Sequence, residues 1–80
     1  MNSFIKYLDI RGKMCPMTFV YTKLELEKME SGAILKVLLD FLPALKNIPD
    51  SCRRQNLAKV INKEKSSNDK NEWILTLKKI

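Results

Sequence analysis

Cys15 is the residue of this chain with the clearest capacity for chemistry. It follows Arg11, Gly12 and Lys13 and precedes Pro16, and proline is favoured at the first position of a helix. The pattern predicts a strand end, a tight basic turn and a helix with Cys15 as its N-cap. Unpaired N–H groups, the helix dipole and nearby cations all favour a thiolate there. The turn therefore predicts a nucleophile, with a small residue before a proline-initiated helix as the alternative.

The composition narrows the classes of function. The chain has no histidine, so a Cys–His hydrolase is excluded, and its two cysteines are too far apart in sequence to predict a zinc site. There is no apolar run of the roughly 20 residues that a membrane span needs. The first residues lack the apolar core of a secretory signal. We therefore expect a cytoplasmic protein with reduced thiols that does not enter a membrane.

The net charge of +6 is unevenly distributed. Residues 1–40 have a net charge of +1 and residues 41–80 a net charge of +5. A basic half can attract RNA or an acidic protein surface. Its lysines are scattered and no aromatic stacking pattern accompanies them, so we do not expect direct nucleic-acid binding. An RNA-binding domain, with strongly salt-dependent affinity, stays open as an alternative.

Hydrophobic periodicity predicts one domain over residues 1–80. Strands are expected at 4–9, 33–39, 57–62 and 72–79, a helix at 16–30, a second helix over 41–56 that restarts at Pro49, and a polar hairpin loop at 63–71. The order βαβαββ predicts an α+β fold, a two-layer α/β sandwich with a four-stranded mixed sheet and two helices on one face. Its first strand–helix–strand unit should be parallel.

The first predicted helix carries apolar residues on two sides. Phe19, Thr22, Leu26 and Met29 form one stripe suited to a core, and Met17, Val20, Tyr21 and Leu24 form a second group. One helix on one sheet cannot bury both sides directly. We expect the second group to lean over the helix edges and become buried, with partial exposure or cover by a partner as the alternatives.

Two further residues have predicted places in this fold. Ligand sites in such sheets gather at the carboxyl ends of parallel strands, so Asp40, after the second strand, should share one rim with Cys15. Cys52 has helical spacing with Ile48, which favours a buried structural thiol over a resolving cysteine.

The chain resembles the TusA/SirA-type sulfur-carrier family over nearly its whole length. The most specific part is Leu8-Asp9-Ile10-Arg11-Gly12 followed by Cys15-Pro16, and agreement continues at Lys23, Leu26, Gly32, Val37, Asp40, Ile48-Pro49, Cys52 and Trp73. Thr18 replaces the second proline of the family's Cys-Pro-x-Pro motif. Phe41 and Leu42 stand where the family commonly has an acidic residue and a proline.

The resemblance implies a two-layer βαβαββ sandwich that works as a persulfide carrier without metal or organic cofactor. Cys15 would accept sulfur from a protein donor such as a cysteine desulfurase and pass it to an acceptor protein, often toward tRNA thiolation. Thiolate-supporting or partner-facing roles would fall to Arg11, Gly12, Lys13, Pro16, Lys23 and Asp40. The alternative is a non-catalytic protein-interaction or regulatory module on the same fold.

Overall fold

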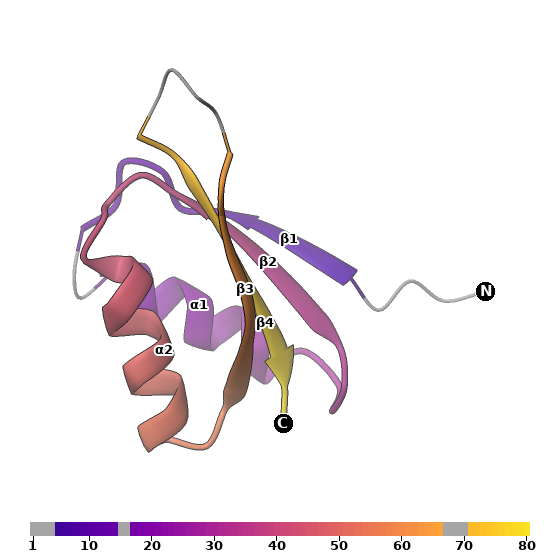
Figure 1. The fold of residues 1–80 in the computed structure, drawn as a ribbon. Helices are drawn as coiled ribbons and strands as arrows, with labels where there is room; N and C mark the ends of the chain where they lie inside the picture. Colours follow the sequence, from indigo (N-terminus) through magenta and orange to yellow (C-terminus); the bar gives the residue numbers. More distant parts are fainter. Residues whose placement is uncertain (1–4, 15–16, 67–70) are drawn as a thin grey trace.

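The computed structural model describes residues 5–14, 17–66 and 71–80 of the chain. Its elements are β1 (Ile5–Asp9), α1 (Met17–Glu27), β2 (Ile34–Leu39), α2 (Ala44–Arg54), β3 (Ala58–Lys65) and β4 (Trp73–Lys79) (Figure 1). The predicted βαβαββ order is confirmed. Phe4, Cys15, Pro16 and residues 67–70 of the predicted loop lie outside the described residues.

The four strands form one mixed sheet in the order β1-β2-β4-β3. β1 pairs with β2 in parallel, as predicted, and β4 pairs antiparallel with both β2 and β3. Both helices cover the same face of this sheet, which confirms the two-layer α+β sandwich (Figure 1). Because β4 is antiparallel, its first residue, Trp73, lies beside Leu39 at the carboxyl end of β2. The carboxyl ends of β1 and β2 and the start of β4 therefore form one rim.

The core lies between the sheet and the helices. It contains Leu35, Val37 and Leu39 of β2, Leu75 and Leu77 of β4, Leu26 of α1, and Ala44, Ile48 and Cys52 of α2, together with Ile10 and Ala58. Burial of one such leucine contributes about 1.5–3 kcal/mol. β2 alternates between buried and half-buried residues, because the described helices cover only one face of the sheet.

The helix α2 continues through Pro49, so the predicted break there is wrong. A proline inside a helix cannot donate the usual backbone hydrogen bond. Ile48, Pro49 and Cys52 are nonetheless all buried, and this packing offsets the missing hydrogen bond.

The strand β3 extends to Lys65, beyond its predicted end at Asn62, and shortens the predicted loop. Lys63 pairs with Leu75 and Lys65 with Trp73. Polar side chains are tolerated because pairing uses the backbone and this edge strand is exposed along most of its length.

The two sides of α1 differ in burial. Thr22 and Leu26 are buried, and Phe19 and Met29 pack partly against the core, as predicted. The second group remains exposed, by 37% at Val20 up to 51% at Leu24, so the expected burial is wrong. Among the described residues, the sheet and α2 lie on one side of α1, and its other side is uncovered. No described helix is both long and apolar enough to span a membrane.

Candidate functional site at the carboxyl ends of β1 and β2

The turn after β1 begins from a fixed point in the core. Ile10 is buried, and its N–H donates to the carbonyl of Leu38 at 2.8 Å. The N–H of Lys13 then donates back to the carbonyl of Ile10 at 3.1 Å. Gly12 between them has φ +83°, a conformation that side chains disfavour and glycine adopts freely. This tight turn was predicted from Gly12. It is followed by Met14, the residue before Cys15.

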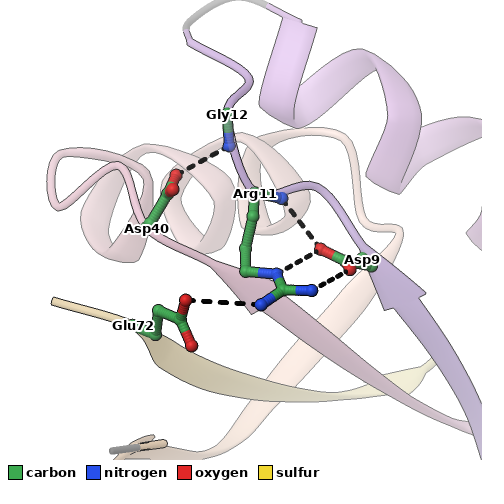
Figure 2. A network of polar contacts seen from close by, with 5 residues as sticks. All are labelled: Asp9, Arg11, Gly12, Asp40 and Glu72. Atoms are coloured by element: carbon green, nitrogen blue, oxygen red, sulfur yellow. Dashed lines mark hydrogen bonds and ion pairs between the residues drawn. The ribbon is translucent and has the colours of Figure 1, made fainter. Parts of the chain in front are cut away.

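Asp40 holds this turn from the neighbouring strand. The N–H of Gly12 donates to Oδ1 of Asp40 at 2.9 Å (Figure 2). Asp40 directly follows β2, so a residue 28 positions later in the sequence anchors the turn. Asp40 and the turn therefore lie at one rim of the sheet. Because Cys15 lies outside the described residues, its own place beside Asp40 stays a prediction.

Arg11 binds two carboxylates at this rim (Figure 2). Its Nε and Nη2 donate to Oδ1 and Oδ2 of Asp9 at 3.0 and 2.8 Å, which is a bidentate pair. Its Nη1 donates to Oε2 of Glu72 at 3.3 Å, and its backbone N–H donates to Oδ1 of Asp9 at 3.0 Å. The side-chain hydrogen bonds from Arg11, then its backbone N–H and its charge, lower the pKa of Asp9 to about 2. The hydrogen bonds to Asp9 and Glu72 raise the pKa of Arg11 above its already high value.

The rim surrounds an open depression of about 530 Å³. Three carboxylates and two cations line it, together with one glycine: Asp9, Arg11, Gly12, Lys13, Asp40 and Glu72. The charge of Arg11 is therefore balanced locally. Lys13 forms no ion pair with a described residue, and its Nζ lies 5.5 Å from the centre of the Tyr21 ring. Lys13 is thus the rim cation with charge left to act on another group.

Other residues singled out in the sequence have different positions. Lys23 lies half-buried on α1 and does not line the depression. Pro16 lies outside the described residues. Sequence reasoning did not propose Asp9 or Glu72 as site residues. The spacing of Asp9 to Arg11 was a usable local signal, whereas Glu72 is 61 positions away and had none.

Cys52 is fully buried on α2, and burial raises the pKa of its thiol to about 11. A thiol with that pKa is protonated at neutral pH and is a poor nucleophile. The prediction of a structural thiol is confirmed. In the described part of the chain, no three His, Cys, Asp or Glu side chains gather closely enough to hold a metal ion.

Comparison with known proteins identifies relatives that match most of the chain, including the residues of this site. A family model described as sulfurtransferase TusA matches residues 6–79. A "putative sulfur carrier protein" of Archaeoglobus fulgidus is 44% identical over 72 residues, which cover 90% of this chain and 78% of the relative. A protein of the same description from Methanocaldococcus jannaschii is 35% identical over 79% of this chain and 84% of its own.

A solved structure shares the fold. The SirA-like protein of Desulfitobacterium hafniense superposes with a TM-score of 0.70, and the match covers 91% of this chain and 95% of that protein. At 20% identity, this likeness bears on the fold alone.

Proposed function

This chain belongs to the TusA sulfurtransferase family of sulfur carriers, and we propose that it relays sulfur as a persulfide on Cys15. The donor is a protein such as a cysteine desulfurase, and the recipient is a second protein. Thiolation of tRNA is the destination that we propose to test first. The single domain of residues 1–80 needs no metal or organic cofactor for this chemistry.

The observation that carries the proposal is the contrast between the two cysteines. Cys52 is fully buried with a raised pKa, which removes it as a nucleophile. Cys15 follows Met14 in the sequence, directly after a turn whose residues Arg11, Gly12 and Lys13 line an open depression at the carboxyl ends of two parallel strands. Exchange of sulfur between proteins requires an accessible thiolate. Because Cys52 is buried, we assign this exchange to Cys15.

The transfer is a thiolate exchange. The Cys15 thiolate attacks the terminal sulfur of the donor's persulfide, and a new S–S bond forms on Cys15 as the donor's own S–S bond breaks. The donor cysteine leaves as a thiolate, so electrons balance without an external oxidant or reductant. The terminal sulfur keeps its proton. In a second exchange of the same kind, an acceptor thiolate attacks the terminal sulfur on Cys15, a new S–S bond forms on the acceptor, and Cys15 leaves as a thiolate.

The residues around the turn have distinct proposed roles. Gly12 permits the turn and Asp40 holds it through its backbone N–H. Lys13 supplies the cation that faces the thiolate or an acidic partner. Pro16 is proposed to favour the start of the helix after Cys15, and Lys23 on α1 is proposed as a partner-facing charge.

Intact-mass measurement tests the proposal directly. The protein is incubated with a cysteine desulfurase and cysteine, alongside Cys15→Ser and the matched control Cys52→Ala. We expect the parent and Cys52→Ala to gain one sulfur atom that a reducing agent removes, and Cys15→Ser to gain none. Loading of Cys15→Ser would contradict the proposal. So would an unloaded parent when the same desulfurase loads another carrier in parallel.

A non-catalytic interaction module is the second candidate, and the uncovered side of α1 favours it. Met17, Val20, Tyr21 and Leu24 form this exposed apolar face. Cys15→Ser should abolish a relay but leave partner binding by a module nearly unchanged, whereas Leu24→Glu should do the reverse. Activity and partner binding of both variants, measured in cells that carry only the variant, separate the two functions.

A further inference from the structure

We propose that Glu72 is a positioning residue for the turn that precedes Cys15 in the sequence, and that it acts by holding the Arg11 guanidinium across the rim. The inference rests on the proposed function, because it assigns a role in presenting the sulfur-bearing residue. Glu72 lies in the segment between β3 and β4, 61 positions after Arg11 in the sequence. The fold brings the two together.

The two anchors of Arg11 come from strands that are not neighbours. Asp9 is the last residue of β1, while Glu72 directly precedes β4, and β2 lies between these two strands. The Arg11 side chain spans the carboxyl end of β2 to reach Glu72 (Figure 2). Asp9 alone would leave the guanidinium tied to β1. Glu72 adds a second attachment on another strand, which restricts how Arg11 and its backbone can move.

Glu72 is itself well held. Its carbonyl accepts the N–H of Ser66 at 2.8 Å, which fixes its backbone at the base of the β3–β4 hairpin. Its side chain is 17% exposed, compared with 43% for Arg11 and 51% for Asp9. A side chain already restricted by its surroundings loses less conformational entropy when it holds a partner. Glu72 is therefore the less exposed of the two carboxylate anchors.

These contacts tie the turn to the sheet at two points. Asp40 holds the Gly12 backbone at the end of β2, and Glu72 holds the Arg11 side chain at the start of β4. Loss of Glu72 should leave the turn attached through Asp40 and Asp9 but should release the Arg11 side chain from the start of β4. We expect sulfur acceptance to slow by about tenfold, since misplacement of a reacting group by about 1 Å can cost a hundredfold.

The test compares Glu72→Ala, which removes the acceptor, with Glu72→Gln, which keeps an oxygen for Nη1. Glu64→Ala is the matched control, because Glu64 is an exposed carboxylate of β3 that bonds Asn62 and does not contact Arg11. Backbone amide NMR of Gly12, Lys13 and Met14 measures the position of the turn without any sulfur chemistry. The rate of sulfur loading is measured on the same samples.

We expect Glu72→Ala to shift the three amides and slow loading, Glu72→Gln to restore most of both, and Glu64→Ala to change neither. Glu72→Ala should add nothing further in an Arg11→Ala background, because Glu72 acts through Arg11. Unchanged amides in Glu72→Ala, or an additive loss in the double variant, would overturn the inference. If the parent itself takes no sulfur, the proposed function fails, while the amide shifts still decide whether Glu72 positions the turn.

Discussion

Gly12 and Asp40 join the turn after β1 to the end of β2 through one hydrogen bond of 2.9 Å. The donor is a backbone N–H, so substitution at Gly12 cannot remove it without a change of backbone, whereas substitution at Asp40 can. Gly12 itself has a positive φ of +83°, which glycine adopts without strain. This hydrogen bond connects the end of β2 to the turn that precedes Cys15 in the sequence.

Asp40→Ala should therefore lower both stability and sulfur acceptance. An exposed hydrogen bond of this kind contributes about 0.5–1 kcal/mol, which corresponds to a fall of a few degrees in Tm for a domain of this size. Asp40→Asn keeps an acceptor oxygen and should retain most of the parent's Tm. Thermal unfolding by circular dichroism measures the difference, and equal Tm values for parent and Asp40→Ala would contradict this role.

The two sides of α1 offer a matched pair of leucines. Leu26 is fully buried and Leu24 is 51% exposed, so Leu26→Ala should cost about 2–5 kcal/mol and Leu24→Ala less than about 0.5 kcal/mol. Both changes alter helix propensity equally. Urea unfolding measures the two values. Comparable costs would show that the outer side of α1 is covered in solution, for example by a second copy of the chain.

The Asp9 carboxyl should titrate unusually low. Its pKa of about 2 in the folded protein lies below the ordinary 3.8, so this contribution to stability is present above pH 3.8 and is lost as the pH falls through about 2. Arg11→Ala removes the side-chain hydrogen bonds but keeps the backbone one, and should move the midpoint part of the way toward 3.8. NMR titration of the carboxyl carbon reports it directly. A midpoint unchanged by Arg11→Ala would contradict the assigned cause.

The Cys52 thiol predicts a loss of stability at alkaline pH. Its pKa rises from 9.0 to about 11 on folding. Its contribution to the free energy of unfolding is therefore complete below pH 9 and disappears as the pH rises through 11. The loss is at most about 2–3 kcal/mol. Chemical unfolding between pH 8 and 11.5, in a Cys15→Ser background with and without Cys52→Ala, isolates it. Parallel pH profiles for the two proteins would show that burial does not protect this thiol.

Local sequence pattern was sufficient for the order of elements, the tight turn at Gly12, the parallel pairing of β1 and β2 and the burial of Cys52. These features depend on periodicity, on the conformational freedom of glycine and on the short connections of a strand–helix–strand unit. Each acts over a few residues or through one well-defined connection. The resemblance of Arg11-Gly12 and Cys15-Pro16 to the sulfur-carrier family also predicted the family, which the comparisons confirm, and it is the basis on which we propose Cys15 as the reactive cysteine.

Tertiary structure alone decided the contact of Arg11 with Glu72 and the exposure of the outer side of α1. Glu72 reaches Arg11 because β4 inserts between β2 and β3, a strand order that no local pattern encodes. The same packing keeps α2 continuous through Pro49 and leaves Val20 and Leu24 exposed, although their apolar character favoured burial. In each case, the outcome depends on which surface lies opposite a residue, and that surface is assembled from distant parts of the chain.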